Sequence, residues 1–215
     1  MPDVPYSPSQ RRPLPIVGQA PPERADAARN RRKILAAAAR MLAAEGAKTL
    51  SLDAVAHAAG VGVGPVSRRF GDRAGLVAAL LDDREQQFQA AFMTGPPPLG
   101  PGAPPAVRLR AFLHAHLDRI EEQRELILLG DTSSPTGRYE SGPYRMRHVH
   151  LATLLNELDL HGDTHYFADA LLALLAPTLI NYQRDVRGLS VEQIKYGLDQ
   201  MLTRILLPSL PTRTA

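Results

Sequence analysis

The sequence predicts an all-α fold, and three observations lead to this prediction. Ala and Leu are abundant in the 215-residue chain, while aromatic residues make up 5% and β-branched residues are few. Such a composition favours helices over strands. Apolar residues also recur every three or four positions in the long segments, as they do on the buried face of a helix. A chain of this length can bury a sizeable core, in one large or two small domains.

The sequence contains no cysteine, which excludes structural disulfides and thiolate metal sites. No apolar run approaches the roughly 20 residues that a membrane-spanning helix requires. Residues 1–15 lack the apolar segment of a signal peptide. We therefore expect a soluble, cytoplasmic protein that does not bind membranes.

Residues 1–23 contain seven prolines, each of which lacks an amide donor and restricts the residue before it. We expect this segment to be a disordered or extended arm. The first helix is expected from Asp26 to Glu45, followed by Gly46. Its apolar stripe has helical spacing. The stripe consists of Ile34, Leu35, Ala38, Met41 and Leu42.

Two short helices joined by a tight turn are expected between Leu52 and Phe70. Ser51 is placed to cap the first helix, and Gly60 is placed to end it with a positive φ. The second helix is expected from Gly64 to Phe70, with Pro65 tolerated in its first turn. Two helices in this arrangement form a helix-turn-helix, whose second helix lies in a DNA major groove.

At these residues the chain resembles the tetracycline-repressor (TetR) family of transcriptional regulators. The matching positions are Val55-Ala56, Ala59-Gly60-Val61, Gly64, Phe70 and Leu76. The resemblance is dense from about Ile34 to Leu80 and concerns only the layout beyond. The departures are Ser67 in place of the usual tyrosine, Arg73 in place of lysine, and Pro65-Val66 in place of Thr-Leu. The resemblance implies a three-helix DNA-binding domain followed by a helical domain that binds a ligand and dimerises.

The charge of the chain is distributed unevenly, which supports a polyanion partner for the N-terminal third. Residues 1–73 carry twelve Lys and Arg against six Asp and Glu, although the net charge of the whole chain is only +3. A basic end on an acidic body suggests that this end alone binds the polyanion. Arg11 and Arg12 in the arm are candidates for a minor groove, and an unstructured tail with incidental charge is the favoured alternative.

The predicted DNA-binding residues surround the second helix of the helix-turn-helix. Arg68 and Arg69 can each bind a phosphate or read a guanine edge. Because several of the first positions offer no polar side chain, part of the specificity is expected to come from DNA shape. The full set is Ser51, Gly62, Val63, Pro65, Ser67, Arg68, Arg69 and Arg73. The alternative is a packed helical corner without a role in DNA binding.

Apolar spacing and Gly/Pro punctuation divide the rest of the chain into helices and loops. The expected helices span 71–93, 106–130 with a break near 121–123, 143–160, 163–186 with a kink at Pro177, and 190–207. The expected loops are 95–105 and 131–142. Ser190 and Gln193 have the spacing of a capping box at the start of the last helix.

Aromatic and histidine side chains of the C-terminal helices are the candidates for a small-molecule site. A mostly apolar cavity with a few polar groups is typical of such sites. The candidate residues are Phe88, Phe92, Phe112, His116, Tyr144, His148, Phe167 and Leu171. For each residue taken alone an ordinary core position is the favoured interpretation, and as a set they indicate an apolar or aromatic effector.

The last two helices are apolar over more surface than one neighbouring helix can cover, which suggests a partner subunit. In the family that the chain resembles, this pair forms a four-helix bundle across a two-fold axis. The expected interface residues are Leu171, Leu175, Leu179, Ile194, Leu198, Met201 and Ile205. Burial of both faces within one subunit is the alternative.

The sequence indicates neither a cofactor nor a catalytic site. The pairs His114/His116 and His148/His150 have a spacing that places their members on different helix faces, so no metal site is expected. No nucleophile elbow or phosphate-binding glycine loop occurs. A helical enzyme that uses these histidines is the remote alternative.

The sequence therefore predicts an all-α homodimeric transcriptional regulator, and a repressor in particular. The expected domains are an arm at 1–23, a DNA-binding domain at 24–73, an effector-binding and dimerisation domain at 74–208, and a tail at 209–215. The expected partners are a palindromic double-stranded DNA operator and a small apolar or aromatic effector that releases it. The alternative is a helical dimeric interaction module that binds nucleic acid or protein without sequence specificity.

Overall fold

The computed structural model describes residues 22–130, 137–160 and 162–206. Every regular element in these ranges is helical, so the predicted all-α class is confirmed. The elements are α1 (Pro22–Glu45), η1 (Ala47–Thr49), α2 (Leu52–Ala59), α3 (Val63–Phe70), α4 (Arg73–Thr94), α5 (Pro105–Glu122), α6 (Arg124–Gly130), α7 (Gly137–Glu140), α8 (Gly142–Glu157), α9 (Thr164–Leu174), α10 (Pro177–Asn181), η2 (Tyr182–Val186) and α11 (Val191–Leu206). The predicted arm lies almost wholly outside the described residues, as does the predicted tail.

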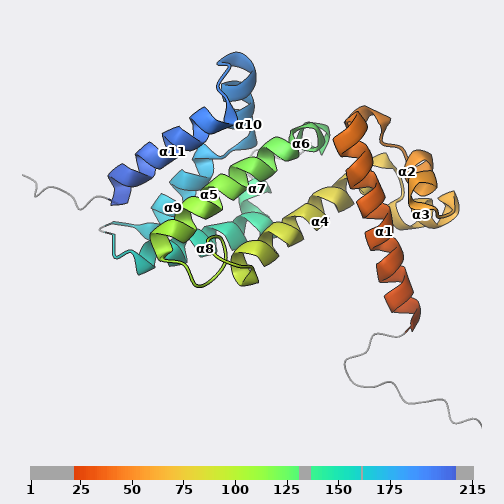
Figure 1. The fold of residues 1–215 in the computed structure, drawn as a ribbon, viewed down its shortest axis with the longest axis horizontal. Helices are drawn as coiled ribbons and strands as arrows, with labels where there is room; N and C mark the ends of the chain where they lie inside the picture. Colours follow the sequence, from red (N-terminus) through yellow and green to blue (C-terminus); the bar gives the residue numbers. More distant parts are fainter. Residues whose placement is uncertain (1–21, 131–136, 161, 207–215) are drawn as a thin grey trace, which may run out of the picture.

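Helices α1, α2 and α3 form a small unit at one end of the molecule, which we call the head (Figure 1). The stripe predicted on α1 packs against α2, with Ile34, Leu35 and Ala38 buried. Val55 and Val66 are fully buried in the same core, and they anchor α2 and α3 respectively. The head is therefore a three-helix unit, as the sequence predicted.

The ends of the helix-turn-helix have the caps that the sequence predicted. Ser51 Oγ accepts a hydrogen bond from the backbone N–H of Ala54 at 3.2 Å, which caps α2. Gly60 ends this helix with a φ of 62°, in the left-handed conformation that glycine adopts without strain. The N–H of the next residue, Val61, donates to the carbonyl of Ala56 at 3.0 Å and closes the turn. α3 begins at Val63, one residue earlier than predicted.

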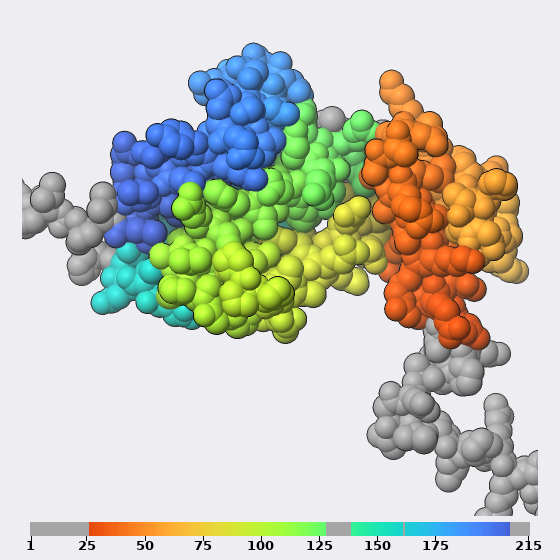
Figure 2. Space-filling model, viewed as in Figure 1, coloured from red at the N-terminus to blue at the C-terminus, as the bar shows by residue number. Residues whose placement is uncertain are grey.

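One long helix, α4, connects the head to the rest of the molecule, which we call the body and which comprises α5 to α11 (Figures 1 and 2). Asp72 caps this helix by accepting a hydrogen bond from the N–H of Gly75 at 2.8 Å. Leu76 and Leu80 near its start are buried in the core of the head, while Phe88 and Phe92 near its end are buried in that of the body. α4 is therefore part of both cores.

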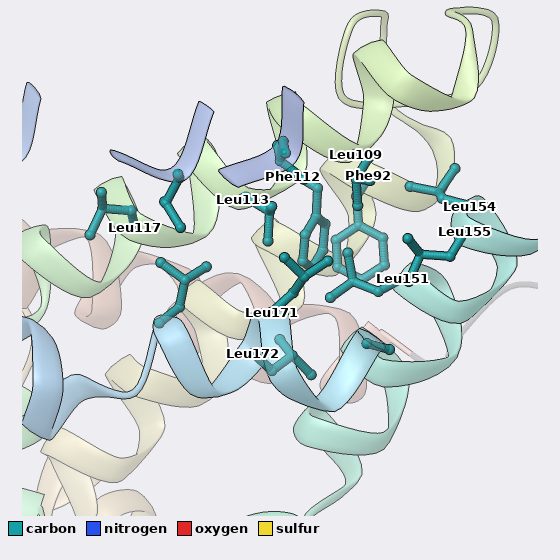
Figure 3. Packing of buried hydrophobic residues seen from close by; sticks show 14 of the residues in the cluster. Phe92, Leu109, Phe112, Leu113, Leu117, Leu151, Leu154, Leu155, Leu171 and Leu172 are labelled. Carbon is teal, nitrogen blue, oxygen red and sulfur yellow. The ribbon is translucent and has the colours of Figure 1, made fainter. Parts of the chain in front are cut away.

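In the body, α5, α8, α9 and α11 surround a second core together with the end of α4. Figure 3 shows the rings of Phe92 and Phe112 lying among leucines of α5, α8 and α9. The predicted interruption of the second long segment is confirmed, because Gln123 separates α5 from α6. The predicted capping box also forms, since Ser190 N–H donates to Gln193 Oε1 at 2.8 Å and Gln193 N–H to Ser190 Oγ at 3.1 Å.

Two predictions about the body are corrected by the structure. A short helix, α7, occupies residues 137–140, where a continuous loop was expected. The predicted kink at Pro177 is instead a complete break between α9 and α10. Ala176, the residue before this proline, is extended with a ψ of 129°, because the proline ring disfavours the helical conformation there. Pro177 then occupies the first position of α10, where its missing N–H is not needed.

Among the described helices, none is long and apolar enough to cross a membrane.

Candidate DNA-binding surface and effector site

The outward face of α3 carries most of the predicted DNA-binding residues. Val66 and Phe70 hold the helix in the core of the head. The residues between and before them face outward, because a three- to four-residue spacing separates the two sides of a helix. The exposed set is Gly62, Val63, Gly64, Pro65, Arg68 and Arg69, and Ser67 is half-buried. α3 is thus a short helix with an anchored side and an open side.

The two arginines of α3 differ in what they contact. Arg69 Nη1 donates to the backbone carbonyl of Ala27 at 3.0 Å, which ties it to the start of α1. Arg68 has no ion pair within the described part of the chain. Its guanidinium is therefore the one of the two that is available to a new acceptor.

Arg73 makes contacts that the sequence did not reveal. Its Nε donates to the carbonyl of Leu50 at 2.9 Å, and its Nη2 donates to the carbonyl of Ala47 at 2.7 Å. These carbonyls belong to η1 and to the residue that follows it, just before α2. The side chain therefore fixes the connection between α1 and α2, whereas the sequence suggested only a phosphate ligand.

The predicted effector residues lie in the core of the body and along a groove that adjoins it. Phe88, Phe92, Phe112 and His116 form one cluster in the core of the body, where neighbouring ring centroids lie 5.1–6.1 Å apart. All four are buried, and Leu171 is buried in the same core. Phe167 is half-buried and packs against this core. Tyr144 is buried in this core as well, and together with His148 it lines a groove of the body.

The sequence analysis missed His150, which extends the aromatic cluster. Its ring centroid lies 4.5 Å from that of Phe92 and 5.0 Å from that of Phe112. Burial and the nearby charge of Arg108 lower the pKa of His150 to about 4, so the ring is neutral at pH 7. His150 was considered only as a metal ligand in the sequence, and its partners lie on other helices.

A buried ion cluster beside these rings was also missed. The carboxylate of Glu85 accepts from Arg147 Nη1 at 2.6 Å and from Gln89 Nε2 at 3.0 Å, and it pairs with Arg119 Nη1 at 3.2 Å. Arg119 also lies over the ring of Phe88, 5.4 Å from its centroid. Burial lowers the pKa of Arg119 to about 10, so it remains charged at pH 7. Only tertiary structure brings these groups together.

The groove that contains Tyr144 and His148 lies between α7, α8 and α9 and has a volume of about 680 Å³. Tyr144 donates to Asp169 Oδ1 at 2.7 Å, and His148 Nδ1 lies 2.8 Å from the same oxygen. Burial opposes the ionisation of Asp169, but these hydrogen bonds outweigh it and lower its pKa. The described residues contain no group of three or more side chains suited to hold a metal ion.

Most of the predicted interface residues face inward. Leu171, Leu175, Ile194 and Leu198 are buried in the core of the same subunit, and Leu179 and Ile205 are half-buried. Met201 alone is well exposed, at 44%. Each of these helices also has exposed residues, which include Tyr166, Asp169, Ala170 and Ala173 on α9 and Tyr196, Gly197, Met201 and Arg204 on α11. The apolar spacing alone did not show which face turns inward.

The start of α6 joins the head to the body. Glu125 Oε2 accepts from the N–H of Ala47 at 2.6 Å, and Leu126 is buried in the core of the head. The preceding residue, Arg124, donates to Asn181 Oδ1 at 3.1 Å and forms two hydrogen bonds of 2.5 and 2.6 Å with Asp185. Adjacent residues of α6 therefore contact the head and the segment formed by α10 and η2.

The head matches a known family in sequence. Residues 34–80 match the sequence model of the bacterial regulatory proteins of the tetR family. This range contains α2, α3 and parts of α1 and α4, so the resemblance predicted from the sequence is confirmed. No curated protein matches the chain in sequence.

Solved structures share the fold over nearly their whole length. A TetR-family transcriptional regulator from Pectobacterium atrosepticum is similar with a TM-score of 0.62 and 20% identity, over 87% of this chain and 99% of that one. NalD, the secondary repressor of the MexAB-OprM multidrug efflux pump in Pseudomonas aeruginosa, is similar with a TM-score of 0.52 and 21% identity, over 83% and 96%. The SmeT–triclosan complex is similar with a TM-score of 0.56 and 17% identity, over 87% and 99%.

Proposed function

We propose that this chain is a DNA-binding transcriptional regulator of the TetR family and that it represses transcription by binding a near-palindromic operator as a homodimer. Members of the family regulate transcription and are not enzymes. The observation that carries the proposal is the form of α3. One side of this helix is anchored in the head, while the other presents an arginine without an ion-pair partner in the described chain.

In the proposed complex, α3 enters the major groove and Arg68 binds a phosphate or a guanine edge. Arg69 is proposed to contact DNA only after it gives up the carbonyl of Ala27. Gly62, Val63 and Pro65 place backbone and small apolar groups near the bases, which supports readout of thymine methyl groups and of DNA shape. Two heads in a dimer would read half-sites about 34–36 Å apart.

The proposed dimer uses the exposed faces of α9 and α11 and not the buried leucines of these helices. On α9 this face includes Tyr166, Ala170 and Ala173, with Asp169 beside them. On α11 it includes Gly197 and Met201, and Tyr196 is exposed next to Gly197. Small and aromatic residues on neighbouring helices can pack against their symmetry copies as a four-helix bundle. The inward leucines would then support this surface from within each subunit.

The proposed effector is a small apolar or aromatic compound that binds beside the aromatic cluster and releases the operator. The similar protein SmeT has been solved with triclosan, an aromatic compound, which supports a ligand of this kind. α4 supplies Phe88 and Phe92 to the cluster and Leu76 and Leu80 to the head. A ligand that binds one arrangement of α4 more tightly than the other would shift the two heads.

Fluorescence anisotropy with the intergenic DNA beside the gene tests this proposal. The expected result is tight binding to the intergenic probe and weak binding to scrambled DNA, at two salt concentrations. Arg68→Ala should weaken specific binding by about tenfold or more. Arg187→Ala removes an exposed arginine of the body and should leave binding unchanged. Equal affinity for both probes with one salt slope would indicate the non-specific module instead.

A further inference from the structure

We propose that the effector is an organic anion: a carboxylic acid with an apolar or aromatic body, whose carboxylate is bound by Arg108 and His150. This inference specifies the chemical class of the effector proposed above, and it rests on that proposal. The site lies where the last turn of α4, the first turn of α5 and the middle of α8 meet.

His150 is a buried polar side chain that lacks a partner. It is only 8% exposed, and its Nε2 forms no hydrogen bond with any described residue. Its nearest ring neighbours are Phe92 and Phe112, which offer no acceptor to this nitrogen. Buried polar groups nearly always have a partner, and leaving one unpaired is costly. The geometry therefore favours a ligand atom at this position.

Arg108 supplies the charge for such a ligand. Its Nη2 donates to the carbonyl of Phe92 at 3.3 Å, while its Nε is buried and forms no hydrogen bond within the described chain. No described carboxylate pairs with it. Arg108 and His150 both contact Phe92, since Arg108 donates to its carbonyl and the ring of His150 lies 4.5 Å from its ring, centroid to centroid. A carboxylate between them would accept from both.

The remaining charges in the core of the body disfavour a cationic ligand. Glu85 is the one buried carboxylate among the described residues, at 7% exposure. It already accepts hydrogen bonds from Arg147 and Gln89 and pairs with Arg119. A cationic ligand would therefore meet Arg108 without a free counter-charge, and a neutral ligand would leave Arg108 unpaired.

The aromatic rings supply the apolar part of the site. Phe92 and Phe112 pack edge to face with centroids 5.1 Å apart (Figure 3). The ring of His150 lies beside both of them. These rings fill the core, so a ligand body must displace one of them in order to enter. Phe92 is on α4, and its carbonyl is also the acceptor of Arg108. Ligand binding would therefore act directly on the last turn of the helix that reaches the head.

The experiment uses three probes that share a phenylbutyl group and differ in charge. They are the anion 4-phenylbutyrate, the neutral alcohol 4-phenylbutanol and the cation 4-phenylbutylammonium. Binding to the full-length protein without DNA is measured at pH 7 by isothermal titration calorimetry. The acid is expected to bind at least about tenfold more tightly than the alcohol, and the ammonium compound least tightly. Acid binding that is no tighter than alcohol binding, or no binding by any probe, would overturn the inference.

Two variants locate the carboxylate. Arg108→Met keeps the aliphatic stem and should remove the preference for the acid, while Arg145→Met in the tyrosine-lined groove should preserve it. The reverse result would assign the acid to that groove and overturn the inference. Histidine NMR gives a second measurement, because a bound carboxylate should raise the pKa of His150 from about 4, with His150→Gln as the assignment control.

Operator release distinguishes this inference from the proposed function. Acid binding that depends on Arg108 but does not release the operator would sustain the carboxylate site and contradict the effector response. Operator release by the alcohol or the ammonium compound, together with weak acid binding, would sustain the effector response and contradict the carboxylate site. Melting curves of Arg108→Met and its operator affinity without ligand verify that the variant is folded.

Discussion

The carboxylate of Glu125 on α6 accepts a hydrogen bond from the backbone N–H of Ala47, 2.6 Å away in the turn before α2. Leu126 follows it into the core of the head. Arg124, one residue earlier, contacts Asn181 of α10 and Asp185 of η2. The start of α6 is thus bound both to the head and to the segment formed by α10 and η2. A displacement of this short helix would therefore move the head and this segment together.

Loss of this contact should destabilise the junction between head and body. Glu125→Ala leaves the N–H of Ala47, a buried residue, without its acceptor, and should lower the free energy of unfolding by about 1–3 kcal/mol. Urea denaturation measures this change. The matched control is Glu122→Ala, because Glu122 is exposed and pairs with Arg84 only at 4.0 Å. Equal stability of the two variants would contradict the proposed role of Glu125.

Arg73 should contribute to stability even in the absence of DNA. Arg73→Met removes two hydrogen bonds to backbone carbonyls and should cost about 1–3 kcal/mol. Arg68→Met removes an arginine without an ion pair in the described chain and should change stability by less than about 0.5 kcal/mol. Chemical denaturation without DNA compares the two. A stable Arg73→Met protein that lost only DNA affinity would assign Arg73 to phosphate binding alone.

A charge on the exposed face of α11 should dissociate the proposed dimer. Met201→Glu places a carboxylate in an apolar contact with the partner, where its desolvation is costly. Met93→Glu changes a methionine of similar exposure at the end of α4 and should leave the dimer intact. Sedimentation velocity measures the mass of each variant. A dimer that persisted in Met201→Glu would exclude this face.

The depressed pKa of His150 predicts a loss of stability on acidification. The unfolded chain binds a proton at His150 near pH 6.5, whereas the folded chain binds it only near pH 4. The contribution of His150 to the free energy of unfolding is therefore fully present above about pH 6.5. It declines by up to about 3 kcal/mol as the pH falls to about 4. The charge of Arg108 contributes to this lowered pKa after burial, and Phe92 and Phe112 are the ring neighbours of His150.

Denaturation of the wild type and of His150→Gln between pH 7 and pH 4 isolates this contribution. The stability difference between the two proteins should shrink or change sign as the pH falls. Asp169 and Asp199 also have lowered pKa values, so they lose their contributions mainly below this range. Parallel pH profiles for the two proteins would contradict the assignment.

Local signals in the sequence were sufficient for the head and for most helix ends. Ser51, Gly60 and the pair Ser190–Gln193 act within a few residues of their own positions, so their roles follow from spacing and residue type. The burial of Val66 and Phe70 also follows from helical periodicity. The outward face of α3 could therefore be predicted before the structure was known.

Contacts between distant segments could not be predicted in this way. Nothing near Arg73 indicates that the carbonyls of Ala47 and Leu50 are its acceptors. The neighbours of His150 come from α4 and α5, which are remote in sequence. Leu171 and Leu198 could be buried either by a partner subunit or within their own subunit, and only packing decides between the two. The break at Pro177 was predicted as a kink, since its extent depends on the helices around it.

Footprinting of the intergenic DNA is the most direct test of sequence-specific recognition by α3. The account predicts two protected half-sites of related sequence, centred one helical turn of DNA apart, with the protection lost in Arg68→Ala. Uniform protection without half-sites, or a footprint unaffected by Arg68→Ala, would contradict it.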